Sequence, residues 1–265
     1  MYSRLNLLYK YAKYLITASN GSGHGIHSPF VYDFIENVLT DDREFYVYQQ
    51  IEQIRKYVLN DNTLIEVEDL GAGSAVIKTK QRSIASIAAT SLRSKKFAQL
   101  LFRIVLYYQP KSIVEIGTSL GITTAYLASA ELTNNVITIE GANSIADIAL
   151  RNFKILQLSN IHLVRGNFDE VLPGVIQNIA AIDFAFIDGN HRYEPTIRYF
   201  EQILLKSNNN TILVFDDIHW SQEMENAWRY IQQHAAVTLS IDLFFMGIVL
   251  LKKEFIQKQH FTIRF

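Results

Sequence analysis

The sequence predicts an α/β protein with a doubly wound, mostly parallel sheet of seven strands and a helical N-terminal extension. The chain has 265 residues, of which 49% are hydrophobic, so it can bury a large core. From residue 112 onward, short β-branched runs alternate with helix-length amphipathic segments, which is typical of a parallel sheet flanked by helices. Residues 1–110 lack this alternation and have a mostly helical periodicity.

The N-terminal extension, residues 1–110, begins with an amphipathic segment. Its apolar residues share one face of a helix: Leu5, Leu8, Tyr9, Ala12, Leu15 and Ile16. We expect this helix to pack on its own domain or to form a homodimer, and a membrane surface is the alternative partner. Turn-forming residues interrupt the extension at 19–29 and 60–74. The extension is therefore predicted to cap or dimerise the domain at 111–265.

The second half of the chain contains the strands. Five apolar runs predict parallel strands at 112–116, 135–140, 161–165, 182–188 and 211–217. The segment 195–206 is predicted to be a helix, because Pro195 suits a first turn and the apolar residues that follow share a face. After a helix near 221–234, runs at 237–242 and 244–253 predict a closing hairpin, which brings the strand number to seven.

Composition and charge narrow the classes of function that the chain can have. The formal net charge is −1 and the basic residues are scattered, which argues against a nucleic-acid partner. The absence of cysteine excludes thiol catalysis, disulfides and thiolate metal sites. No segment has the pattern of a signal peptide, and the longest apolar run, 243–251, is too short to span a bilayer. We therefore expect a cytoplasmic protein that acts on a small molecule.

Two glycine-rich stretches, "EDLGAGS" at 68–74 and "IVEIGTSLG" at 113–121, could each hold a nucleotide-like cofactor. Such a loop needs a buried strand before it, a helix after it and an acidic residue at the end of the next strand. The later loop meets all three conditions, and its acid is Glu140. The earlier stretch is followed by "KTKQRS" and has no such frame, so it is interpreted as a turn of the extension, with a lid over the active site as the alternative.

The spacing of the later loop indicates which cofactor it holds. Gly117 and Gly121 give only G-x-x-x-G, whereas a dinucleotide requires G-x-G-x-x-G. Glu115, just before the first glycine, suits a cofactor with a cationic amino-acid end. S-adenosylmethionine has such an end.

Several segments in order then resemble a known family: "VEIGTSLGITTAYLA", "TIE", "RGNFDEVLP", "FAFIDGNHRY" and "VFDDIHW". They resemble the motifs of class I S-adenosylmethionine-dependent methyltransferases with a Rossmann-like sheet, most of all the catechol and caffeoyl-CoA O-methyltransferases. The resemblance covers about residues 112–251. It implies that the cofactor's methionine part is wrapped by a loop comprising Glu115, Gly117, Thr118, Ser119 and Gly121.

The same resemblance implies that Glu140 binds the ribose hydroxyls and that Asn167 and Phe168 lie beside the adenine. For Glu140 the alternative is a solvated carboxylate at a strand end. For Asn167 and Phe168 it is a turn that leads into a helix, because such a turn uses the same residue types.

Acidic residues end the fourth and fifth predicted strands: Asp188 in the fourth, and Asp216 and Asp217 in the fifth. Carboxyl ends of parallel strands meet at one edge of a sheet, and converging carboxylates repel unless a cation such as Mg²⁺ bridges them. The resemblance implies that all three are metal ligands, with Asp188 also part of the catalytic machinery. Asp217 departs from the family pattern, which has Asn there.

His191 stands where the catechol-type pattern has a lysine that acts as general base. An imidazole can take a hydroxyl proton at neutral pH, and the alternative is that His191 caps a helix or binds substrate. His219 and Trp220 are predicted to line the acceptor pocket, although Trp220 also suits the core.

The predicted function is S-adenosylmethionine-dependent methyl transfer to a hydroxyl of a small-molecule acceptor, assisted by a divalent cation. Two alternatives remain at this point. One is metal-independent N- or O-methylation, in which the acids bind the substrate. The other is a non-catalytic module that binds the cofactor or a protein partner.

Overall fold

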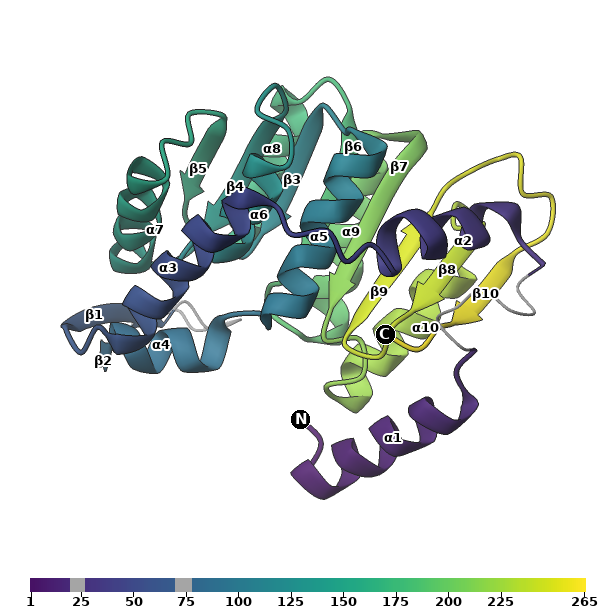
Figure 1. Ribbon diagram of the computed structural model, residues 1–265, viewed down its shortest axis with the longest axis horizontal. Coiled ribbons are helices and arrows are strands. Elements are labelled where there is room, and N and C mark those ends of the chain that lie inside the picture. The colour runs from purple at the N-terminus through teal and green to yellow at the C-terminus, as the bar shows by residue number, and fades with distance from the viewer. Residues whose placement is uncertain (20–26, 70–77) are drawn as a thin grey trace. The chain divides into compact units, whose positions relative to one another are not determined.

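The computed structural model describes residues 1–19, 27–69 and 78–265, and the chain divides into two compact units. Unit 1 comprises Met1–Asp41 and Ile176–Phe265, and unit 2 comprises Asp42–Val175. In the described residues no helix is both long and apolar enough to cross a membrane. Figure 1 labels the helices and strands of both units.

Unit 2 carries the predicted cofactor loop on a three-stranded parallel portion of sheet. In it β3 pairs with β4, and β4 pairs with β5. Its elements are α3 (Tyr46–Asn60), β1 (Leu64–Asp69), β2 (Lys78–Ser83), α4 (Ile84–Ser91), α5 (Lys95–Tyr108), β3 (Ser112–Ile116), α6 (Ile122–Ser129), β4 (Asn135–Glu140), α7 (Asn143–Ile155) and β5 (Ile161–Arg165). The helix α8 (Phe168–Asn178) crosses the boundary between the units.

A two-stranded ribbon, β1–β2, interrupts the helical extension, which the sequence did not predict. Its strands pair antiparallel, with Leu64 opposite Ser83 and Val67 opposite Lys80. Strand β2 is the segment "KTKQRS", whose polar composition carries no apolar alternation. The hydroxyl of Ser144, in α7, donates to the backbone carbonyl of Glu66 at 2.6 Å. The ribbon is thus held by backbone pairing and by this contact with α7, neither of which leaves an apolar pattern.

Unit 1 holds five strands in the order β10-β8-β9-β7-β6 (Figure 1). Strands β6 and β7 are parallel, and β8 and β9 form the predicted antiparallel hairpin. The elements are α1 (Arg4–Thr17), α2 (Pro29–Phe34) with a π-helical turn (Ile35–Leu39), β6 (Ile182–Ile187), α9 (Tyr193–Leu204), β7 (Ser207–Asp216), α10 (Gln222–Gln233), β8 (Leu239–Asp242), β9 (Met246–Leu250) and β10 (Gln259–Thr262).

The predicted class, a mostly parallel α/β sheet with N-terminal helices, is confirmed, but the strand number differs. Among the described residues, unit 2 has three strands of this sheet, β3 to β5, and unit 1 has five, β6 to β10, because β10 adds to the edge by pairing parallel with β8. Strand β10 alternates between half-buried and exposed residues, and its sequence, QHFT, lacks the long apolar run of a central strand. By contrast, β6 and β7 bury Phe184, Phe186 and Phe215 almost completely. These aromatic side chains form the core beneath the strand ends that carry the acids.

Candidate active site

The loop after β3 is shaped by left-handed backbone conformations. Gly117 and Gly121 have φ values of 105° and 78°, and Ser119 has a φ of 48°. A Cβ atom at Gly121 would lie 2.5 Å from a ring carbon of Phe153, in α7. The second glycine is therefore required both by conformation and by the close approach of a helix.

Glu115 is completely buried directly beneath this loop. Its Oε2 accepts hydrogen bonds from the hydroxyls of Thr124 and Thr138, the latter at 2.6 Å. The Thr138 hydroxyl also lies 2.6 Å from that of Thr118, in the loop. Glu115 thus ties β3, β4, α6 and the loop together, and its predicted contact with the cofactor stays a prediction.

Glu140 ends β4 and binds the same loop. Its Oε2 accepts from the backbone N–H of Ser119 at 2.8 Å, and its Oε1 accepts from that of Ala142 at 2.9 Å. Burial raises the pKa of the Glu140 carboxyl, while the N–H groups of Ala142, Ser119 and Gly141 act in the opposite direction. An ionised carboxylate fixed by N–H donors keeps further lone pairs that can accept ribose hydroxyls. The structure fits the predicted ribose role without testing it.

Asn167 and Phe168 lie at the start of α8. The Oδ1 of Asn167 accepts from the backbone N–H of Asp169 at 3.0 Å, and its carbonyl accepts from the N–H groups of Glu170 and Val171. Asn167 therefore caps the helix, as the sequence alternative proposed. The position of Asn167 and Phe168 beside the adenine stays a prediction.

Sequence reasoning missed Ser91, which contacts the predicted cofactor loop. The hydroxyl of Ser91, at the end of α4, lies 2.8 Å from that of Ser119. Ser91 belongs to the extension and stands in no motif, so only its spatial position reveals the contact. The glycines of "EDLGAGS" lie outside the described residues.

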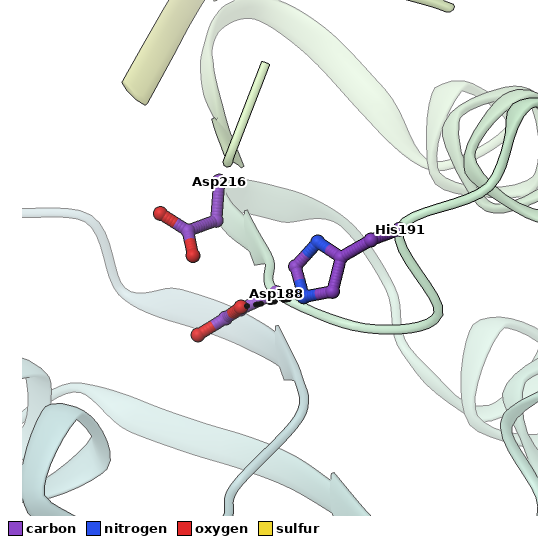
Figure 2. A group of neighbouring side chains, drawn as sticks. All are labelled: Asp188, His191 and Asp216. Carbon is purple, nitrogen blue, oxygen red and sulfur yellow. Dashed lines mark ion pairs between the residues drawn. The ribbon is translucent and has the colours of Figure 1, made fainter. Parts of the chain in front are cut away.

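The acidic site forms in unit 1, at the carboxyl ends of β6 and β7 (Figure 2). Asp188, His191 and Asp216 each place one ligand atom so that all three atoms lie within 4.8 Å of one another. The Nε2 of His191 is 3.3 Å from the Oδ1 of Asp188. Asp216 is fully buried, whereas Asp188 and His191 are partly exposed. The structure thus brings together two of the three predicted acids and the predicted base.

Asp217 is not among the described residues that form this cluster. It has a φ of 53°, its N–H donates to the carbonyl of Phe245 at 2.7 Å, and its carbonyl accepts from the N–H of Trp220 at 2.9 Å. Its left-handed conformation begins a turn, which Asp and Asn both tolerate. Asp at position 217 therefore suits this backbone conformation as well as the family's Asn does. The ligand role of Asp217 stays a prediction.

His219 lies between two carboxylates. Its Nδ1 is 3.1 Å from the Oε1 of Glu225, and its Nε2 is 2.8 Å from the Oδ2 of Asp242. Burial lowers the pKa of His219, but Asp242 and then Glu225 raise it by hydrogen bonding and charge, and the net direction is upward. Both ring nitrogens are thus engaged within the fold. The predicted place of His219 and Trp220 in the acceptor pocket stays a prediction.

Three comparisons place the chain among known proteins. A family model described as a methyltransferase domain matches residues 114–218. A catechol O-methyltransferase from Niastella koreensis is 28% identical over 173 residues, which cover 64% of this chain and 74% of that protein.

Solved structures share the fold. The O-methyltransferase from Bacillus cereus in complex with SAH has a TM-score of 0.57 and 19% identity, covering 80% of this chain and 93% of that one. TomG, an O-methyltransferase from Streptomyces achromogenes in complex with SAM, has a TM-score of 0.55 and 19% identity, covering 79% and 91%.

The fold and the glycine loop define a Rossmann-like enzyme of the methyltransferase class. The chain is a class I S-adenosylmethionine-dependent methyltransferase whose domain at residues 114–218 matches the family model, and it is similar to a catechol O-methyltransferase. This confirms the resemblance found in the sequence. It also removes the alternative of a non-catalytic module.

Proposed function

We propose that the protein transfers a methyl group from S-adenosylmethionine to a hydroxyl of a small molecule, and that a divalent cation at Asp188, His191 and Asp216 assists the transfer. The convergence of these three side chains carries the proposal. The name of the Niastella koreensis relative supports catechols as the first acceptor class to test.

The three side chains fit a divalent cation. Two carboxylate oxygens and one imidazole nitrogen within 4.8 Å of one another are a partial ligand set that leaves further positions for water and substrate. Imidazole is a better ligand for Mn²⁺ and later transition metals than for Mg²⁺, which prefers oxygen alone. We therefore rank Mn²⁺ above Mg²⁺ as the cation to test first.

The short distance between His191 and Asp188 requires a proton or a cation between the two side chains. A lone pair on Nε2 and a carboxylate oxygen 3.3 Å away repel unless a proton or a cation is shared. In the proton case, Asp188 orients the ring and stabilises the imidazolium that forms when His191 takes a hydroxyl proton. In the cation case, the same two atoms act as ligands.

The residues of the chain then have distinct tasks in the proposal. Asp188 and Asp216 hold negative charge where the acceptor hydroxyl is bound. Without a cation, Asp188 accepts from the Nε2–H of His191, and Nδ1 receives the hydroxyl proton. With a cation held on Nε2, the hydroxyl proton would pass to solvent water. A bound cation supplies Lewis acidity that lowers the pKa of this hydroxyl. Glu140 and the loop at 115–121 hold the methyl donor, whose sulfonium becomes a neutral thioether as the new O–CH₃ bond forms. Most of the acceleration comes from positioning.

Metal-independent transfer remains the second candidate, because the His191–Asp188 pair is also a suitable base without a cation. In that case Asp216 binds polar groups of the acceptor.

Transfer of a labelled methyl group to catechol, to a monohydroxylated phenol and to an aromatic amine tests the proposal. We expect transfer to catechol that falls on EDTA treatment and returns with Mn²⁺, and a loss of about 10²- to 10⁴-fold in kcat in His191→Ala. Transfer that ignores EDTA supports the metal-independent candidate. Transfer only to the amine contradicts hydroxyl methylation.

A further inference from the structure

The outward face of α1 is the feature that the proposed function leaves unused. Leu5, Leu8, Tyr9 and Ile16 are 80%, 64%, 71% and 81% exposed. Their spacing puts them on one side of the helix, so they form a continuous apolar stripe. Single exposed apolar residues are ordinary, but a stripe of four large ones on one helix marks an interaction surface.

The opposite face of α1 is firmly attached to unit 1. Tyr14 is buried against Phe244, and its hydroxyl donates to the carbonyl of Ile263 at 2.5 Å. Burial raises the pKa of Tyr14 to about 12, so this hydroxyl keeps its proton. Lys10 binds Glu225 at 2.8 Å. The helix is therefore already ordered when a partner meets its outer face, which lowers the entropic cost of binding.

The charges around the stripe are of one sign. α1 contains Arg4, Lys10 and Lys13 and no acidic residue. Lys10 is paired within the fold, whereas Arg4 and Lys13 are exposed and lie on the two flanks of the stripe by helical spacing. Arg264, also exposed, donates to the carbonyl of Leu15 near the end of the same helix. An apolar stripe between basic flanks is complementary to an anionic lipid surface.

A second copy of the chain fits the stripe less well. Pairing two identical stripes brings Arg4 and Lys13 of both copies together without an acid to neutralise them. A helix of 14 residues also offers far fewer side chains than the roughly 20 to 30 per side of a stable interface.

We propose that α1 attaches the protein peripherally to anionic membranes, with Leu5, Leu8, Tyr9 and Ile16 in the interfacial layer and Arg4 and Lys13 at the lipid phosphates. Long basic side chains reach such phosphates while their stems stay beside apolar neighbours.

Vesicle co-sedimentation of the full chain tests this proposal. Vesicles of phosphatidylcholine with about a third phosphatidylserine should bind the protein, with binding weakened by salt, and pure phosphatidylcholine vesicles should bind it at least about tenfold more weakly. The double variant Leu5→Glu, Ile16→Glu should lose at least about tenfold in binding, because both side chains leave the apolar layer. The matched control is Ile256→Glu, which changes a side chain that is 97% exposed outside α1 and should bind as the wild type does.

Thermal melting and light scattering separate the other outcomes. The double variant should melt like the wild type, because the altered side chains contact solvent. Equal binding of the wild type and the double variant to anionic vesicles contradicts the proposal. The proposal is also contradicted if the wild type forms a dimer that dissociates in the double variant and neither protein binds vesicles. That result would assign the stripe to a second copy of the chain.

Discussion

Left-handed backbone conformations at Ser119, His191 and Asp217 occur in three segments that carry predicted site residues, one after each of β3, β6 and β7. Each such conformation costs of the order of 1 to 3 kcal/mol in a residue with a Cβ atom. At Ser119 the conformation is held by the carboxylate of Glu140 and the hydroxyl of Ser91. Backbone strain of this kind persists where neighbouring groups fix the conformation. Here the side chains of Glu140 and Ser91 fix the loop that is predicted to bind the cofactor.

Replacement of Ser119 by glycine separates strain from positioning. Gln109→Gly is the matched control, because Gln109 has a φ of 50° at the end of α5, outside the loop. We expect the control to raise the free energy of unfolding by about 0.5 to 1 kcal/mol. Ser119→Gly should gain less, because it loses the contact with Ser91, and should weaken cofactor binding. Urea unfolding measures the free energy of unfolding of the two variants, and calorimetry measures their affinity for S-adenosylhomocysteine. An unchanged affinity in Ser119→Gly counts against a positioning role for Ser119.

Glu140→Ala should weaken binding of S-adenosylhomocysteine by roughly 1 to 3 kcal/mol, because the ribose hydroxyls and two backbone N–H groups lose their acceptor. Calorimetric titration measures this loss. Glu131→Ala removes a carboxylate that accepts from the N–H and hydroxyl of Thr133 in the same unit, and should leave the affinity unchanged. Equal affinities in the two variants would remove Glu140 from the site.

At the scale of elements, α1 is joined to α10 and β8 through ionisable groups. Glu225 binds Lys10 and His219, and His219 also binds Asp242. Because the pKa of His219 is raised in the folded chain, its contribution to stability is complete below the pKa of unfolded histidine, about 6.5. This contribution is lost as pH rises through the folded pKa.

We expect the free energy of unfolding to fall as pH rises above about 6.5, and His219→Gln to remove that part of the fall. His260 provides a control of opposite sign, because burial and then Lys258 lower its pKa. His260→Gln should instead remove a loss of stability at low pH. A pH profile of urea unfolding that His219→Gln leaves unchanged contradicts the assignment.

Elements with apolar runs could be predicted from the sequence, and those held by other forces could not. The runs at 112–116 and 211–217 became β3 and part of β7, because burial on both faces selects continuous apolar residues. The ribbon β1–β2 and the edge strand β10 are largely polar, so pairing with a neighbour defines them. The same limit applies to Ser91, whose contact with Ser119 depends on tertiary placement.

At the scale of the whole molecule, the sequence placed Asp188 and Asp216 together from strand order alone, since parallel strands end at one edge. It could not show that Asp217 has a left-handed backbone and stands outside the cluster, because the conformation at a strand end depends on the local turn. The division of the chain into an extension and a domain at residue 110 stays a prediction. The cation is the part of the proposed mechanism on which the roles of all these acids depend.

Calorimetric titration of Mn²⁺ into the wild type, Asp216→Asn and Asp217→Asn tests that cation most directly. Asp216 and Asp217 are neighbours of equal charge, and only Asp216 belongs to the cluster. The account predicts one Mn²⁺ site per chain in the wild type, its retention in Asp217→Asn, and a loss of at least about tenfold in affinity in Asp216→Asn. Indistinguishable titrations of the wild type and Asp216→Asn would contradict it.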